Sequence, residues 1–168
     1  REALHRLMDL GHRRIVMLSR EERRKPQPGV FEQTFLDALK AGGLAAGAYN
    51  LPDWEESAAG LNRCLEGLFQ LTPPTAIFVS DAVLCLAVKN YLGRQRGLAP
   101  RRVTLLCTDD HPTFEWCDPP MPHFSWDPQV VVRRVVRWVD KVSRGKEDRR
   151  QQFVTAKFVA GELSGPGG

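Results

Sequence analysis

The chain has 168 residues, a hydrophobic fraction of 42% and a formal net charge of +4, which suits one domain or one lobe of a larger domain. No apolar run approaches the roughly 18 residues of a membrane helix and no signal peptide opens the chain, so we expect a soluble, cytoplasmic protein without a membrane partner. The basic residues stand in short groups between acidic and apolar positions, and no zinc-finger, RNP-like or helix-turn-helix motif is present. Any DNA contact is therefore expected to come from a domain outside this sequence.

The first element is an amphipathic helix that leads into a buried strand. Apolar residues recur at helical spacing up to Leu10, Gly11 can adopt the left-handed conformation that ends a helix, and residues 15–18 are all apolar. A strand that is apolar at every position is typical of a parallel sheet covered on both faces. A crossover helix follows a strand, so we expect the preceding strand to belong to an upstream portion of the protein.

The middle of the chain alternates helices and strands, separated by glycines and prolines. A polar loop covers residues 19–28. The pattern then predicts helices over residues 29–40 and 55–70, and a third helix that is capped by Ser80 or Asp81 and ends at Leu92. It predicts a weak short strand over residues 49–52 and strands over 75–79 and 103–107. Alternation of this kind predicts an α/β fold, a three-layer parallel sheet with helices on both faces in a Rossmann-like lobe.

The alternation of helices and strands is interrupted between Pro112 and Pro128, where prolines and aromatic residues predict an extended crossing segment. Asp127 then caps a helix that has Pro128 at its first position and a strongly apolar valine face. Residues 141–150 form a solvated charged stretch, a last strand covers about 152–159, and residues 164–168 form a flexible tail.

The four cysteines, Cys64, Cys85, Cys107 and Cys117, are scattered without a Cys-x-x-Cys pair. Cys85 and Cys107 lie in apolar runs, where a free thiol behaves as a small hydrophobic residue. We predict buried, reduced cysteines and therefore a reducing compartment.

The junction Leu10-Gly11-His12-Arg13-Arg14-Ile15 is the first of several motifs that occur in a fixed order along the chain. It is followed by Phe35-Leu36-Asp37-Ala38-Leu39 with Gly43-Leu44, by residues 73–79, by Pro100 with residues 103–106, and by Thr108-Asp109-Asp110. Each motif alone is weak. The ordered series covers nearly the whole chain and resembles the ligand-binding region of LacI/GalR-type bacterial transcription regulators.

This resemblance implies a periplasmic-binding-protein-like core of two α/β lobes, with a small effector, often a sugar or nucleobase, in the cleft between them. In such proteins a DNA-binding domain precedes the core. On this pattern residues 1–12 are the incoming crossover helix, residues 13–119 are the second lobe, and residues 120–168 are a crossing segment, a helix and a strand that return toward the first lobe. The chain would thus lack the DNA-binding domain and the first part of the core.

The expected function is the effector-binding region of a transcription regulator that senses a small molecule, with a carbohydrate as one candidate, and that acts as a homodimer. Closure of the two lobes on the effector would shift the population of states that bind DNA. The alternatives are a transport-type solute-binding protein of the same fold and a lobe that has lost effector binding. No cofactor or metal is expected.

Candidate ligand contacts follow strands at the carboxyl edge of the predicted sheet, where open parallel sheets bind ligands. Ser19 follows the first strand, Asp81 the second, and Asp109 and Asp110 the third. Carboxylates accept hydrogen bonds from neighbouring hydroxyls, which favours a sugar-like or amine-bearing effector. The resemblance implies that Asp81 and Asp109 lie near the ligand, although Asp81 is also a candidate helix cap.

Trp54 and Trp126 are candidate aromatic contacts. The resemblance implies that Trp54 stacks on a sugar, and the alternative is that it packs against its own helix. Trp126 either lines the cleft or packs at the hinge. Phe31 stands where the family often has an arginine that bonds the sugar, so an apolar or aromatic ligand, or none, remains an alternative.

The sequence does not favour an enzyme. Gly-x-Gly-x-x-Gly after a strand, a Walker-type phosphate loop and Gly-x-Ser-x-Gly are all absent. The histidines include no pair at metal-binding helical spacing. Asp109, Asp110 and His111 leave acid–base chemistry only as a minor alternative.

Overall fold

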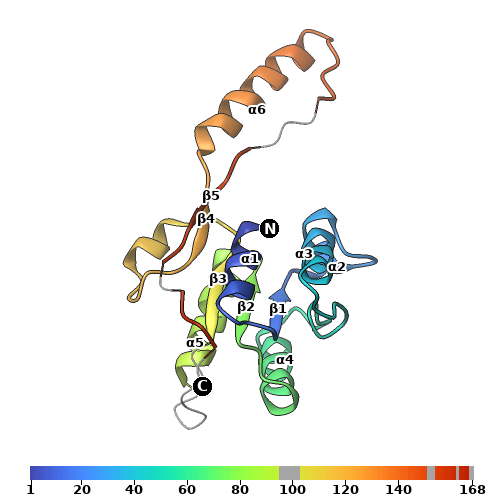
Figure 1. Cartoon of the computed structure of the whole chain (residues 1–168). Helices are drawn as coiled ribbons and strands as arrows, with labels where there is room; N and C mark the ends of the chain where they lie inside the picture. Colours follow the sequence, from blue (N-terminus) through green and yellow to red (C-terminus); the bar gives the residue numbers. More distant parts are fainter. Residues whose placement is uncertain (95–102, 151–153, 162, 167–168) are drawn as a thin grey trace.

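The computed structural model describes residues 1–94, 103–150, 154–161 and 163–166. Within these residues the chain forms a five-stranded sheet in the order β1-β2-β3-β4-β5 (Figure 1). The first four strands are parallel and β5 pairs antiparallel with β4. The strands are β1 (Ile15–Leu18), β2 (Ala76–Val79), β3 (Thr104–Cys107), β4 (His123–Ser125) and β5 (Lys157–Val159).

Strands β1, β2 and β3 are buried at every position. Alternate residues point to opposite faces of a sheet, and the two sets pack into two separate cores. One core receives Val16, Ile77 and Leu105, while the other receives Met17, Phe78 and Leu106. A strand that packs into two cores carries apolar residues on both of its faces. The predicted buried parallel strands are confirmed.

Helices cover both faces of this sheet. On one face lie α4 (Ala58–Leu71) and α5 (Ala82–Arg94), which contribute Leu65 and Val88 to the first core. On the other face lie α1 (Glu2–Asp9) and α3 (Val30–Ala41), which contribute Leu7 and Leu39 to the second. The predicted three-layer α/β class is confirmed, with β5 as an antiparallel addition.

The weak strand predicted over residues 49–52 is wrong, because this segment forms a turn. The N–H of Asn50 donates to the carbonyl of Gly47, and the side-chain oxygen of Asn50 accepts from the Gly47 N–H. Such side-chain bonding to nearby backbone favours a turn over a ladder. The segment still borders β1, because the Met17 N–H donates to the Asn50 carbonyl at 2.7 Å.

Two segments expected to be irregular contain helical turns. The polar loop holds α2 (Glu21–Arg24), whose last residue is buried. The crossing segment holds a short 3-10 helix, η1 (Pro112–Trp116), in which the His111 ring accepts from the Thr113 N–H. In α2 the Arg24 side chain donates to the Ser19 carbonyl. Hydrophobic periodicity does not reveal such contacts in helical segments of four or five residues.

The junction between α1 and β1 has the predicted form, with Gly11 in the left-handed region at φ 95°. His12 follows and is fully buried, with its Nε2 2.8 Å from the carbonyl oxygen of Ser164. The predicted flexible tail is therefore wrong for Ser164 and Pro166, which pack against this junction. Residues 167–168 lie outside the described part, as do residues 152–153 of the predicted last strand.

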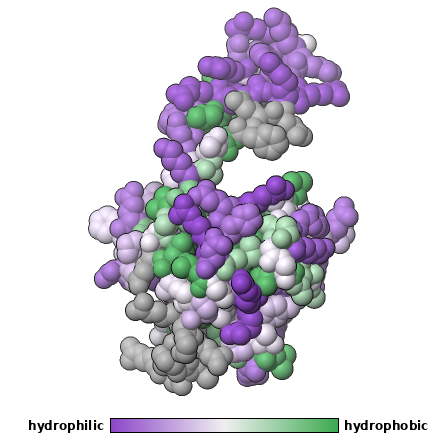
Figure 2. Space-filling model, in the orientation of Figure 1, coloured by the Kyte–Doolittle hydropathy of each residue, from purple (hydrophilic) through white to green (hydrophobic). Residues whose placement is uncertain are grey.

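Helix α6 (Pro128–Ser143) projects away from the sheet (Figure 1). Its predicted cap is confirmed, because Asp127 accepts from the Gln129 N–H at 2.9 Å. None of its residues is buried in the described structure, although it carries a face of large apolar side chains. Figure 2 shows hydrophilic residues over the outer end of this projection and hydrophobic residues nearer the sheet. The exposed members are Val132, Val135, Val136, Trp138, Val139 and Val142.

Cys85 and Cys107 are buried in the first core as predicted, whereas Cys64 and Cys117 are half-buried and pack against that core. In the described part of the chain no helix has both the length and the apolar character to cross a membrane.

Candidate functional site

Three loops meet where β1, β2 and β3 end. The Ser80 N–H donates to the Leu18 carbonyl at 3.0 Å, and the Thr108 N–H donates to the Val79 carbonyl at 2.9 Å. The Thr108 hydroxyl also donates to the Ser80 carbonyl at 3.2 Å. These bonds hold the loops together at the carboxyl edge of the parallel strands, the region where such sheets bind ligands.

Arg20 and Asp81 form a paired contact across this edge. The Nε and Nη2 atoms of Arg20 donate to the two carboxylate oxygens of Asp81 at 2.8 and 3.0 Å. Arg20 also donates to Glu56 at 2.8 Å, and Glu56 accepts from the Glu21 N–H at 2.9 Å. A bidentate guanidinium–carboxylate pair is geometrically specific, so the two loops are held in one arrangement.

Asp81 is also the N-terminal cap of α5, because it accepts from the Leu84 N–H at 2.9 Å. Burial acts to raise the pKa of this carboxyl, but the hydrogen bonds from Arg20 and Leu84 outweigh it, and the pKa lies below its ordinary value of 3.8. The cap role is thus present in the structure, and the ligand role of Asp81 stays a prediction. A ligand hydroxyl would compete with donors that the chain already supplies.

The replacement Arg20→Ala is expected to lower the free energy of unfolding by about 1 kcal/mol at pH 7, because the pair is partly exposed and screened by solvent. Asp81 has a lowered pKa in the folded state, so this contribution is present above pH 3.8 and is lost as the pH falls through and below that value. Urea denaturation at pH 7 and pH 3 measures it. Arg6→Ala, which removes an exposed pair with Glu2, is the control, and an equal loss from both variants would contradict this assignment.

Ser19 lies beside a buried carboxylate. Its hydroxyl donates to Glu32 at 2.6 Å, and both residues are buried. The hydroxyl proton is therefore engaged within the protein, and contact of Ser19 with a ligand stays a prediction.

Trp54 is 7% exposed and packs against Arg24. The guanidinium carbon of Arg24 lies 5.3 Å from the centre of the Trp54 ring, and Arg24 donates to the Trp54 carbonyl. The following helix begins at Ala58 with Ser57 as its cap, three residues later than predicted. The Trp54 ring thus packs both against Arg24 of α2 and within the first core. Stacking of Trp54 on a ligand stays a prediction.

Asp110 joins the loop after β3 to the crossing segment. One of its oxygens accepts from the Ser125 hydroxyl at 2.9 Å and from the Trp126 N–H at 3.1 Å. Asp110, Trp126 and His123 line a cavity of about 470 Å³. The structure therefore brings two of the predicted residues, Asp110 and Trp126, to one hollow.

Asp109 is the carboxylate of this edge with the fewest contacts. It is half-buried, and its Oδ1 accepts from the Asp110 N–H at 2.9 Å. Asp109 forms no ion pair with any residue that the structure describes. Of the predicted acidic contacts, it retains the most capacity to accept hydrogen bonds from a ligand.

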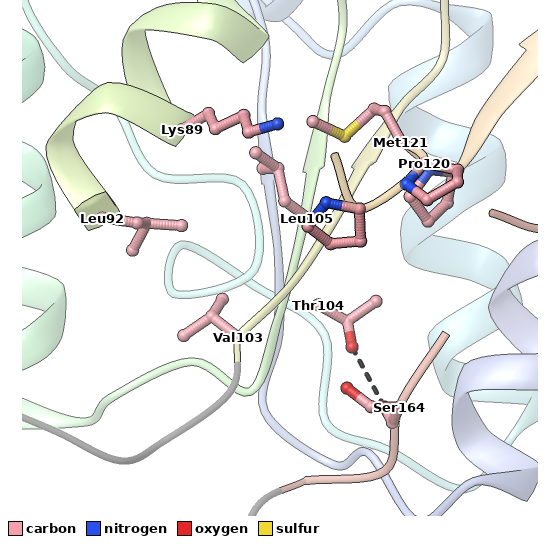
Figure 3. Close-up of a pocket in the computed structure, with 10 residues that line it drawn as sticks. Lys89, Leu92, Val103, Thr104, Leu105, Pro120, Met121 and Ser164 are labelled. Carbon is pink, nitrogen blue, oxygen red and sulfur yellow. Dashed lines mark hydrogen bonds between the residues drawn. The ribbon is translucent and has the colours of Figure 1, made fainter. Parts of the chain in front are cut away.

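Another cavity, of about 400 Å³, lies between α5 and the beginning of β3 (Figure 3). Its lining includes Lys89 and Leu92, and Thr104 there donates to the Ser164 carbonyl at 3.0 Å. Thr104 is the first residue of β3, so this cavity lies at the end of the strand opposite to the predicted contacts.

The sequence places Arg20 directly after the first buried strand, at the predicted ligand edge, but does not indicate its pairing with Asp81. It does not single out Glu56 or Glu32. Glu56 and Glu32 have no comparable signal, because their partners Arg20 and Ser19 are 36 and 13 residues away. Among the described residues, no three His, Cys, Asp or Glu side chains form a group that could hold a metal ion.

Comparison with known proteins supports the arrangement of the fold. The periplasmic binding protein-like domain matches residues 4–162. No curated protein sequence matches the chain. Among solved structures, a transcriptional regulator LacI from Bacillus cereus subsp. cytotoxis has a TM-score of 0.80 and 20% identity, over 99% of this chain and 60% of that one.

Two further structures have similar scores. A LacI family transcriptional regulator from Bifidobacterium animalis subsp. lactis has a TM-score of 0.77 and 15% identity, over 99% of this chain and 60% of that one. A LacI family regulator from Enterococcus faecium, solved with bound ribose, has a TM-score of 0.75 and 16% identity, over 98% of this chain and 61% of that one. The chain thus spans about 60% of the length of these proteins. At these identities the likeness shows a shared fold.

Proposed function

The chain belongs to the periplasmic binding protein-like domain family. From this premise we propose that it contains the second lobe of the effector-binding core of a bacterial transcription regulator, at residues 13–119, and that residues 120–168 return toward the first lobe. The observation that carries the proposal is the carboxyl edge of the sheet, where the loops after β1, β2 and β3 are joined and Asp109 remains available. The similar structures are named as transcription regulators rather than enzymes. One of them holds ribose, which supports a small-molecule effector here.

The proposal gives α6 a role in joining the two lobes. Its valine face is exposed in the described structure. A contiguous exposed apolar face is typical of an interaction surface. We assign this face to the first lobe, with the cleft between that lobe and the sheet edge. The strands β4 and β5, which continue the sheet, would hold α6 at the crossing between the lobes.

In this proposal the effector shifts the population of open and closed cores, and a DNA-binding domain attached to the core responds to that shift. A ligand can act in this way only through a difference in its affinity for the two states. Contacts from Asp109 on one lobe, completed by the opposite lobe on closure, would supply such a difference. A homodimer would transmit the change to the spacing of two DNA-binding domains.

Thermal-shift measurements on the full-length protein with pentoses, hexoses and nucleosides test this function. A stabilising compound is expected to raise the melting temperature of the wild type, by an amount that corresponds to about 2.7 kcal/mol at a concentration of 100 Kd. The replacement Asp109→Asn removes the charge and is expected to abolish most of the shift. The control Asp9→Asn changes an exposed carboxylate at the end of α1 and should leave it unchanged.

Two outcomes would count against the proposal. A ligand whose stabilisation survives Asp109→Asn would place the site elsewhere. A protein that no compound stabilises would contradict effector binding by this lobe.

A further inference from the structure

A second hollow beside the candidate site is lined by aromatic side chains. It has a volume of about 210 Å³ and lies on the face of the sheet covered by α1 and α3. Among the described residues, its phenylalanines are Phe31 and Phe35 from α3, Phe78 from β2 and Phe124 from β4. Thr108 shares the lining and directly precedes Asp109, so the hollow adjoins the carboxyl edge of the sheet.

The aromatic rings leave one wall of the hollow open. Phe35 and Phe78 are 5% and 4% exposed, and their ring centroids lie 5.5 Å apart at 58°. Phe31, by contrast, is 45% exposed. Tilted rings at this separation attract one another, and a further planar ring packs favourably against such faces and edges. A ligand ring in the hollow would cover apolar surface that Phe31 now presents to solvent.

The two hydroxyl groups of the lining, those of Thr34 and Thr108, are suited to accept hydrogen bonds from a ligand. The Thr34 hydroxyl donates to the Val30 carbonyl at 2.7 Å, and the Thr108 hydroxyl donates to the Ser80 carbonyl at 3.2 Å. A hydroxyl has one proton and two lone pairs, so each oxygen retains acceptor capacity after its proton is engaged. A ligand N–H or O–H group matches these oxygens.

The charged groups make a free sugar a poor match for this hollow. Its lining in the described chain contains no carboxylate, and its one charged side chain is that of Arg1. Asp109 follows Thr108 but does not itself line the hollow. A sugar carries hydroxyls around its whole ring, and burying them against phenylalanine without partners is unfavourable.

We infer that the effector of this lobe carries a small planar aromatic ring with an N–H or O–H donor, and that the ring binds between Phe31, Phe35, Phe78 and Phe124. The inference rests on the proposed function, because it treats the adjoining sheet edge as the effector site. The volume suits one ring system rather than the ligands of drug size that fill pockets of roughly 300–1,000 Å³.

Indole is a suitable probe, and isothermal titration calorimetry of the chain measures its binding. The replacement Phe31→Arg puts a cation at the open wall and is expected to weaken indole binding at least about tenfold, because the apolar contact is lost. Val30→Arg is the matched control, since Val30 is 87% exposed on the same helix and does not line the hollow. Circular dichroism confirms that both variants fold.

A second comparison tests the hydrogen bond. 1-Methylindole has no N–H group, and we expect it to bind about threefold to tenfold more weakly than indole. Equal binding of the two compounds would exclude Thr34 and Thr108 as acceptors and overturn this part of the inference. D-ribose is expected to bind more weakly than indole and to be unaffected by Phe31→Arg.

The outcomes separate this inference from the proposed function. Indole binding that is equal in the wild type and Phe31→Arg, or no indole binding at all, overturns the aromatic site. If a sugar nevertheless binds and Asp109→Asn abolishes its binding, the proposed function stands without the aromatic site. Loss of indole binding in Phe31→Arg, with Val30→Arg unchanged, supports the inference.

Discussion

Replacement of Arg24 by alanine is expected to lower the free energy of unfolding by about 3 kcal/mol, the largest effect of any basic residue in the region around α2. The Arg24 side chain is 3% exposed. It donates to the Ser19 carbonyl at 3.0 Å and to the Trp54 carbonyl, and its guanidinium lies over the Trp54 ring. Alanine would leave buried acceptors without these donors and would open a void beside the ring.

The ion pair of Arg24 with Asp53 contributes little to this expectation, because Asp53 is 66% exposed. Arg23→Ala is the matched control, since Arg23 is the preceding residue of the same helical turn and is exposed. Urea denaturation at pH 7, followed by circular dichroism, measures both variants. A loss below about 1 kcal/mol for Arg24→Ala would show that water replaces the guanidinium at low cost.

Replacement of His12 by alanine is expected to cost about 2–4 kcal/mol of stability. His12 is fully buried, and its Nε2 donates to the Ser164 carbonyl at 2.8 Å. Its Nδ1 therefore accepts from the Thr75 hydroxyl at 2.9 Å. The ring connects the α1–β1 junction to the start of β2 and to the C-terminal segment, and alanine would leave a cavity where these three meet.

The same contacts predict a pH dependence. Burial lowers the pKa of His12 below its ordinary value of 6.5, although the bond to Ser164 acts in the opposite direction. The unfolded chain then binds a proton more readily than the folded chain. This contribution to stability is therefore complete above pH 6.5 and declines as the pH falls below that value.

Urea denaturation between pH 8 and pH 5 measures this dependence. The replacement His12→Asn should flatten the stability profile below pH 6.5, whereas His5→Ala, at an exposed position of α1, should leave it unchanged. An unaltered profile in His12→Asn would mean that another group controls stability in this range.

The elements with continuous patterns could be predicted from the sequence. Residues 15–18, 76–79 and 105–107 are apolar at successive positions, a pattern typical of a parallel strand that is covered by helices on both faces. Asp127 and Pro128 predict the start of α6, because the residue preferences of a helix cap and of the first helical turn depend only on neighbouring residues. The turn at Asn50 could not be predicted, since its side chain bonds to both Gly47 and the distant Ile15 carbonyl.

The sequence predicted where the candidate site lies, but not which of its carboxylates are available to a ligand. The order of the strands places Asp81 and Asp109 at one edge of a parallel sheet. Whether each carboxylate is available depends on partners far along the chain, because Arg20 reaches Asp81 from 61 residues away. The spacing of charged residues carries no information about such pairs.

The sequence by itself determined the α/β class, the buried parallel strands and the edge at which polar loops gather, because each follows from periodicity and from the geometry of parallel strands. Only the tertiary structure decided that Arg24 covers Trp54, that Ser164 packs on His12, and that Phe31, Phe78 and Phe124 enclose one hollow. The physical reason is that these contacts join residues from separate elements. Their energies depend on burial and mutual geometry, which form only when the layers pack.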